Sequence, residues 1–376
     1  MDFSFSDEQN LIQGQVEQFI QRDYDWEKRQ SLVLSELGFS EENWKTFAEL
    51  GWLGISLSEN SGGFGGNAIE TMIVMEEFGK GLVVEPFLET IVLGATLVDL
   101  AATSEQKKEI LLPVISGDLQ LALAFTEPQS RFNLFDITTE AKHLGKDFIL
   151  NGFKSVVMNG PAANKFIVTT RTSGNQRDSK GVTLFIVDSD SQGLTLRNYK
   201  TVDGRRASEL TLEQVKIPSD SMLGSIGNQS ISLEEAVDIA TLALCAEAVG
   251  IMEVLYKSTV EYAKTREQFG QPIGKFQVLQ HRMVDMFMEY EQCKSLLYRA
   301  TMETIQDPEA AQRTIHALMH LIGKSGMFIG ENAVQLHGGM GMTEELRIGH
   351  YFKRLLVIDA TFGNADYHLQ KFTTFS

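Results

Sequence analysis

One acidic residue lies in an apolar stretch and could act as a base. The segment "TLALCAEAVGIMEVL" covers residues 241 to 255, and Glu247 is the only acidic residue between Ile239 and Met252. Desolvation raises the pKa of a carboxyl group toward neutrality, which suits a group that must accept a proton from a poor acid. Glu247 is therefore our candidate for a catalytic base. The alternatives are a carboxylate that faces solvent and one that pairs with an arginine at a subunit contact.

Two further stretches could bind an anion. "KTREQFGQPIGKFQ" ends a long helix near Arg266 and then turns, and "QLHGGMGM" places Gly338, Gly339 and Gly341 just after another helix. Backbone amides at such glycines can approach a phosphate closely. Each stretch alone also has a simpler explanation. The glycines could only end a helix, and Arg266 could only satisfy the carbonyls and dipole of a helix C-terminus.

Other common enzyme signatures are absent from the sequence. It contains no GxSxG elbow, no HExxH, no Walker loop and no strand-GxGxxG-helix unit for a nicotinamide cofactor. The glycine-dense "SGGFGG" at 61–66 is interpreted as a turn because no strand precedes it. The seven histidines are scattered, so we expect no metal centre.

The elements that must position these residues fall into three segments. Residues 1–118 have helical periodicity and begin with a capping box at Ser6 and Gln9. Residues 119–227 contain seven strand-like runs separated by turn signals, without helices between them. Residues 228–376 return to long helices, with an apolar seam from Leu279 to Ala300. We predict a multidomain α+β fold: an all-α N-terminal domain, an antiparallel β-barrel middle domain and a C-terminal four-helix bundle.

The charge and the cysteine content exclude several classes of protein. The chain has 50 acidic and 33 basic residues, a net charge of -17, which repels both nucleic acid and anionic membranes. Its two cysteines, Cys245 and Cys293, are too few for a disulfide framework. The N-terminus lacks the features of a signal peptide, and no run reaches the roughly 18 apolar residues of a spanning helix. We expect a cytoplasmic protein with no nucleic-acid or membrane partner.

Taken together and in this order, the motifs carry a resemblance to a known family. "YAKTREQFGQPIGKFQVLQHRMVDM" and "QLHGGMGMTEE" closely resemble the C-terminal domain of the acyl-CoA dehydrogenases. "TEP" at 126–128, "NGFK" at 151–154 and the order of the domains agree as well. The resemblance covers essentially the whole chain. Within the family, the chain is most similar to the small subunits of pimeloyl-CoA dehydrogenases.

The resemblance implies that FAD is the cofactor and that it lies between subunits of a tetramer. The isoalloxazine ring would rest on the middle domain, where Thr126 matches the family. The ADP portion would reach the bundle of a neighbouring subunit. Six residues of this sequence match that half of the site: Arg266, Gln268 and Phe269 near the nucleotide, and Gln335, Gly338 and Gly339 around the pyrophosphate.

The sequence departs from the family at the positions of the catalytic base. The usual base is a glutamate in a "YEGT"-like stretch, and that position holds Phe362 here, followed by a matching Gly363. Some relatives carry the base on the first bundle helix, where this chain has Ala240. Glu247 lies seven residues after Ala240, two helical turns along nearly the same face, so it remains the candidate.

The flavin-ring platform also departs from the family. Relatives follow "TEP" with small residues, whereas here Arg131 and Phe132 occur, and an aromatic "WIT"-like stretch is replaced by Val156 to Met158. Thr241 replaces an arginine that many relatives direct at the substrate. Arg131 is a weak candidate for binding a distal carboxylate of the substrate.

The resemblance predicts an FAD-dependent acyl-CoA dehydrogenase in the β-oxidation of fatty acids or steroid side chains. It leaves open whether the acyl chain of the substrate is a dicarboxyl, fatty or steroid side chain. We expect a heterotetramer, most simply α2β2 with a homologous acyl-CoA dehydrogenase subunit. Electron-transfer flavoprotein is the acceptor that the family implies. The alternatives are a non-catalytic subunit that completes the FAD site of its homologue, and an oxidase or monooxygenase on the same fold.

Overall fold

The computed structural model describes residues 4–375, which form two compact units. Unit 1 combines Met1–Gln30, Ala68–Val83 and Thr241–Ser376, and unit 2 combines Ser31–Asn67 and Val84–Ala240. Each unit therefore gathers stretches that are distant in sequence. The predicted domain boundaries at 118 and 227 stay a prediction.

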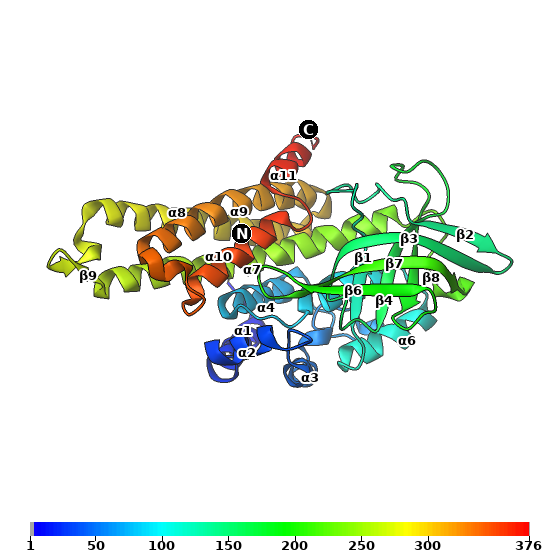
Figure 1. Cartoon of the computed structure of the whole chain (residues 1–376), viewed down its shortest axis with the longest axis horizontal. Helices are drawn as coiled ribbons and strands as arrows, with labels where there is room; N and C mark the ends of the chain where they lie inside the picture. The colour runs from blue at the N-terminus through cyan, green and yellow to red at the C-terminus, as the bar shows by residue number, and fades with distance from the viewer. Residues whose placement is uncertain (1–3, 376) are drawn as a thin grey trace. The chain divides into compact units, whose positions relative to one another are not determined.

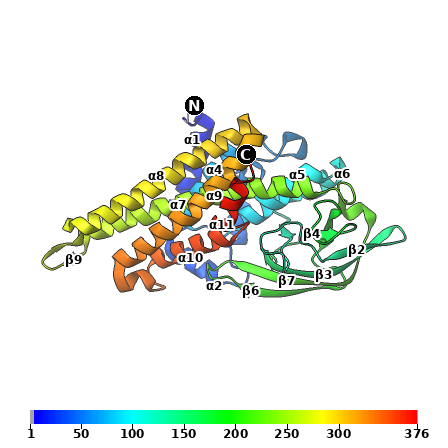
Figure 2. The same cartoon turned by 90° about the horizontal axis from the view of Figure 1, so that it is seen from above.

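Unit 1 is built of helices. It contains α1 (Asp7–Asp23), α4 (Ala68–Gly81), the later part of α7 (Ser230–Thr265), α8 (Gln277–Gln306), α9 (Pro308–His337), α10 (Arg347–Ala360) and α11 (Ala365–Phe372). In both views α8 and α9 run side by side (Figures 1 and 2). The predicted seam of α8 is buried at Met286, Tyr290, Cys293, Leu297 and Ala300.

Local sequence explains where these helices begin. The Ser6 side chain accepts a hydrogen bond from the Gln9 amide at 3.2 Å and the Gln9 side chain bonds back to the Ser6 amide at 3.0 Å, which confirms the predicted capping box. Asp307 caps α9, with Pro308 at its first turn. Such caps satisfy amides that the first turn leaves without partners.

Helix α7 is unusually long and apolar. It is the one helix of the described residues long and apolar enough to span a membrane, with a mean hydropathy of 1.7 over its most apolar window. We had not expected any segment to meet that criterion. However, 78% of the window is buried inside the protein, as in the core helix of a soluble protein.

Unit 2 contains an eight-stranded sheet in the order β6-β7-β3-β2-β4-β5-β8, with β1 also paired to β4. The strands are β1 (Leu121–Ala124), β2 (Glu140–Leu144), β3 (Asp147–Met158), β4 (Lys165–Arg171), β5 (Val182–Asp188), β6 (Leu194–Lys200), β7 (Arg206–Ile217) and β8 (Met222–Leu223). All seven predicted strands are present, but β1 pairs with β4 in parallel, which we had not predicted. The long chain between β1 and β4 permits this pairing because parallel neighbours need a long connection.

Helical segments complete unit 2. They are α3 (Glu41–Glu49), η1 (Trp52–Gly54), η2 (Glu59–Ser61), η3 (Leu88–Ala95), α5 (Thr96–Ala101), α6 (Ser104–Ile115) and η4 (Ser219–Ser221), and α2 (Trp26–Leu34) crosses the boundary between the units. The element η3 is a π-helix and buried throughout. The residue pattern of this segment does not predict a π-helix. The fold is that of the predicted class: N-terminal helices, a middle β-domain and C-terminal helices.

Candidate flavin and acyl-CoA site

The glycine turn after α9 presents open backbone. Gly338 and Gly339 are exposed at the start of η6 (Gly338–Met342), and a Cβ atom added at either would meet nothing within 4 Å. Gly341 differs, because its Cβ would lie 2.7 Å from the Val334 carbonyl. A left-handed φ of 64° explains the glycine at 338. Among residues 4–375, none comes close enough to require a glycine at 339, so this position is open to an external group.

A short hairpin follows α7 and carries an exposed aromatic ring. Strands β9 (Glu267–Gln268) and β10 (Gln271–Pro272) are joined by Phe269 and Gly270, whose φ angles of 54° and 78° suit a two-residue turn. The Phe269 side chain is 92% exposed, at the tip labelled β9 in Figure 1. Arg266 and Gln268 are exposed beside it. The exposed ring is available for contact with another molecule.

A ring stack joins these two stretches within unit 1. The rings of Tyr262 and His337 lie 4.4 Å apart at 27°. The Tyr262 carbonyl accepts the Arg266 amide at 2.8 Å, and His337 directly precedes the glycine turn. Burial lowers the pKa of His337, against the opposing effect of its bond to the Ala333 carbonyl, so a neutral imidazole forms the stack. The structure thus brings Arg266 and the glycines to one end of the unit.

Sequence reasoning did not find this stack. Its only signals were the four-residue spacing of Tyr262 and Arg266 and the position of His337 before two glycines. Both are common patterns, and the contact joins residues 75 positions apart in sequence. Gln335, on the last turn of α9, is exposed, and its carbonyl accepts the Gly338 amide.

In unit 2, the "TEP" and "NGFK" motifs form a buried ion pair. Lys154 donates to Glu127 at 2.7 Å, and both side chains are fully buried. The amide and hydroxyl of Thr139 add bonds of 3.0 and 2.7 Å. Burial alone would raise the pKa of Glu127, but Lys154 and hydrogen bonds from Thr138 and Gln129 hold that pKa at about 2. The pair orders the strands beneath Thr126, so we assign it a structural role.

The predicted ring platform lies next to that pair. Thr126 is half-buried, and its carbonyl accepts the Ser155 amide at 2.8 Å. Val156 is half exposed with φ 49°, at an irregularity in the pairing of β3 with β7. A β-branched residue in the left-handed region is strained, and such residues gather at functional sites. Arg131 is also exposed, with φ 46°.

Glu247 lies in the interior of unit 1 and is paired. Its carboxylate accepts two hydrogen bonds from Arg354, both of 2.7 Å, and its side chain is 1% exposed. Arg354 belongs to α10, in the same unit. This geometry matches the arginine-paired alternative, although the arginine is in the same chain and not across a subunit contact. A guanidinium that binds both oxygens favours the charged carboxylate, and the role of Glu247 as base stays a prediction.

The two family positions for a base are both apolar here. Phe362 has φ 60° and Gly363 φ 130°, in the turn between α10 and α11. Ala240 is fully buried on α7, and Thr241 beside it is nearly so. Within residues 4–375, no group of three or more histidine, cysteine or acidic side chains could hold a metal ion.

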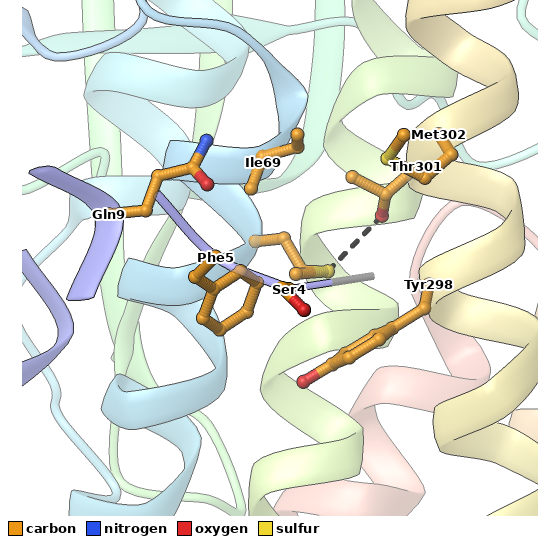
Figure 3. Close-up of a pocket in the computed structure, with 8 residues that line it drawn as sticks. Ser4, Phe5, Gln9, Ile69, Tyr298, Thr301 and Met302 are labelled. Atoms are coloured by element: carbon orange, nitrogen blue, oxygen red, sulfur yellow. Dashed lines mark hydrogen bonds between the residues drawn. The ribbon is translucent and has the colours of Figure 1, made fainter. Parts of the chain in front are cut away.

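A separate apolar cavity lies in unit 1, between the N-terminal segment, α4 and α8 (Figure 3). Its volume is about 80 Å³, and Phe5, Met72 and Tyr298 are among the residues that line it. Thr301 Oγ1 lies 3.3 Å from Met72 Sδ. None of its eight lining residues is acidic, basic or a histidine. We therefore assign it no acid–base chemistry.

Comparison with known proteins identifies three matching family models. Residues 6–118, 122–215 and 232–373 match the N-terminal, middle and C-terminal domains of acyl-CoA dehydrogenase. The chain is 30% identical over 361 residues to the short-chain specific acyl-CoA dehydrogenase of Clostridium acetobutylicum, covering 92% of this chain and 91% of the relative.

Two solved structures extend the comparison. The FAD complex of PigA has a TM-score of 0.92 at 27% identity, covering 100% of this chain and 98% of the other. The Tcur3481-Tcur3483 steroid ACAD, solved as a G363A variant, has a TM-score of 0.87 at 27% identity, with coverages of 98% and 97%. The exposed residues at the glycine turn and the hairpin fit the nucleotide half of FAD, because they combine a guanidinium, glycine backbone with free space around it and an aromatic ring.

Proposed function

Because the chain belongs to the acyl-CoA dehydrogenase family and FAD is its cofactor, we propose that it takes part in the α,β-dehydrogenation of an acyl-CoA thioester to the trans-2-enoyl-CoA as one subunit of a heteromeric enzyme. Family members are oxidoreductases that act on CH–CH donors. One contrast carries the proposal. All six nucleotide-half residues are present and exposed, while neither base position holds an acid.

Each residue of the nucleotide half has a definite task. The Arg266 guanidinium and the amide of Gly339 would bind phosphate oxygens, while Gly338, whose amide bonds to the Gln335 carbonyl, would leave room for them. Phe269 would pack against the nucleotide of the neighbouring subunit. When bound at these residues, FAD would supply the acceptor for the β-hydrogen, which leaves the substrate as a hydride. Thr126 and the backbone around Val156 would support the ring in unit 2.

The α-proton needs a base, which we place in the homologous subunit or at Glu247. Phe362 and Ala240 cannot accept a proton. Glu247 would first have to leave Arg354, which would uncover a buried guanidinium. This favours the homologous subunit, and with it the alternative of a non-catalytic partner chain.

The surface of the bundle supports assembly with another chain. Several apolar side chains of α8 are strongly exposed: Val278, Val284, Phe287 and Met288. Large exposed apolar patches mark protein interfaces, and these side chains would contribute to one. The steroid ACAD relative carries the names of two gene products. We therefore propose an α2β2 tetramer in the cytoplasm that transfers electrons to electron-transfer flavoprotein.

The decisive experiment compares this chain alone with this chain co-expressed with a homologous subunit. We expect little FAD and no activity from the chain alone, and about one FAD for every two chains in an active complex. Replacing the base glutamate of the homologue should then abolish flavin reduction. A fully flavinated and active homotetramer would contradict the heteromeric proposal.

The substrate side chain can be tested in the same complex. If Arg131 binds a distal carboxylate, Arg131→Ala should lower kcat/KM for a dicarboxyl-CoA, such as pimeloyl-CoA, far more than for a monocarboxyl-CoA of equal length. Equal losses for both would remove Arg131 from the site. Slow reaction of the reduced flavin with oxygen would separate this activity from an oxidase.

A further inference from the structure

A small hollow in unit 2 adjoins the predicted ring platform. Its volume is about 20 Å³, room for roughly one water-sized group. Its lining includes apolar side chains from three parts of the unit and three charged ones: Phe39, Val84, Pro86, Met158, Glu89, Arg205 and Arg206. Met158 ends β3 and belongs to the predicted ring platform. The hollow therefore adjoins the place where the proposed function puts the substrate.

Glu89 is the unusual member of this group. It is the only charged residue of the π-helix η3, and turns of this kind are frequent at functional sites. Glu89 Oε1 lies 3.4 Å from Arg205 Nη1. Glu89 Oε2 is buried and accepts no hydrogen bond from any residue that the structure describes. A buried carboxylate oxygen without a donor is costly, so a donor from outside the chain is expected.

The other polar side chains of the hollow are already engaged. The Arg206 guanidinium donates to backbone carbonyls of Val33, Ser35, Glu36, Gly204 and Arg205. The Asn159 amide donates to Thr90 and Gln120 side chains at 3.2 and 3.1 Å. Glu89 is thus the group of the hollow with an open acceptor.

We propose that Glu89 accepts a hydrogen bond from a hydroxyl group on the acyl chain of the thioester and so determines specificity. This inference rests on the proposed function. A carboxylate offers only acceptors, so its ligand must be a donor. Arg205 balances the charge of Glu89, which favours a neutral hydroxyl over an ammonium group. The size of the hollow admits a hydroxyl and little more.

The test measures binding, independently of turnover. Positional isomers of a hydroxyacyl-CoA and the parent acyl-CoA are titrated into the assembled enzyme by calorimetry, with non-oxidisable thioether analogues. We expect one isomer to bind about 10-fold to 100-fold more tightly than the parent. Glu89→Met/Arg205→Met should abolish that preference without leaving a lone buried charge. The substitutions are made only in this chain and not in the homologous subunit. Any change in the preference for one isomer is therefore due to the hollow in this chain.

Controls separate this inference from the function on which it rests. Glu85→Gln is the matched control, because Glu85 is equally buried in the same segment, bonds to Asn43 at 2.8 Å and does not line the hollow. It should keep the preference. Glu89→Gln, which keeps the shape and loses the charge, should give an intermediate value if the double variant does not fold. This inference alone is overturned if the parent acyl-CoA binds as tightly as every hydroxyacyl-CoA isomer. It is also overturned if the double variant still prefers one isomer. Failure of every acyl-CoA to bind overturns the proposed function too.

Discussion

At the residue scale, the glycine turn offers a direct test of the flavin half-site. A methyl group at Gly339 meets nothing in this chain, so Gly339→Ala should leave the melting temperature unchanged and obstruct a phosphate that approaches the amide. We expect FAD to bind roughly tenfold or more weakly, by equilibrium dialysis of the assembled enzyme. Arg266→Ala should act in the same direction.

The control for that variant is Gly14→Ala. Gly14 lies on α1, is exposed, and has nothing within 4 Å of an added Cβ. This substitution should keep FAD affinity and raise stability slightly, by up to about 1 kcal/mol through helix propensity. If both variants retain FAD equally, the turn is not part of the flavin site.

The pair of Glu247 and Arg354 is a second test at this scale. Glu247→Gln leaves a buried guanidinium without its countercharge, so we expect a loss of about 3–5 kcal/mol in the free energy of unfolding. Glu247→Leu/Arg354→Met removes both charges and should recover most of that loss. Denaturant unfolding measures both variants.

Kinetics on the same variants address catalysis. If the pair of Glu247 and Arg354 has only a structural role, the double variant should keep flavin reduction and α-proton exchange in the active assembly. A loss of 10²-fold or more in the stable double variant, with FAD content unchanged, would instead support Glu247 as the base.

At the element scale, the crossing of α4 and α7 depends on two glycines. A Cβ at Gly250 would lie 2.0 Å from the Glu76 carbonyl oxygen, and one at Gly79 would lie 2.1 Å from that of Glu247. Both obstacles are backbone, which cannot turn aside as a side chain can. Gly250→Ala should therefore destabilise the protein by about 1–3 kcal/mol or more, seen as a lower denaturation midpoint.

Gly326→Ala is the matched control for this crossing. Gly326 is also buried in a long helix, but its Cβ would meet side chains of Leu355 and Met252 at 3.4 Å, close to an ordinary contact. Alanine there should be tolerated. An equal loss for both variants would mean that the close crossing has no special importance.

Some of these elements could be predicted from the sequence, and the contacts of the site could not. The capping box at Ser6, the α8 seam and all seven strand runs follow from local periodicity, and each formed as predicted. The contacts that define the site are different in kind. Arg354 reaches Glu247 across 107 positions, and no periodic pattern records such a pairing. The π-helix η3 could not be predicted either, because one extra residue per turn hardly changes the pattern of an almost wholly apolar segment.

At the scale of the whole molecule, a buried histidine pair predicts how stability depends on pH. His316 and His368 join α9 to α11 through a hydrogen bond of 2.8 Å between their Nδ1 atoms. Burial lowers the pKa of His316 to about 4 and that of His368 to about 3. The unfolded chain binds protons at these residues from about pH 6.5 downward, and the folded chain does not. Stability should therefore fall as the pH drops from about 6.5 to about 4, by up to roughly 1.4 kcal/mol per pH unit for each histidine.

Denaturant unfolding across that range measures the slope. His316→Phe/His368→Leu should flatten it, whereas replacement of the exposed His281 by glutamine should not. An unchanged slope in the double variant would assign the pH dependence to other groups.

The turn at Phe362 has a consequence for engineering this chain. Its shape is set in part by Gly363, where an added Cβ would lie 2.3 Å from the Tyr367 ring, and by the helices on either side. Gly363 and these helices would stay unchanged if Phe362 were replaced by glutamate. The turn therefore offers a place at which an acid could be introduced without altering its glycine. If the heteromeric proposal holds, such a variant would show whether a subunit that depends on its partner for a base can be given one of its own.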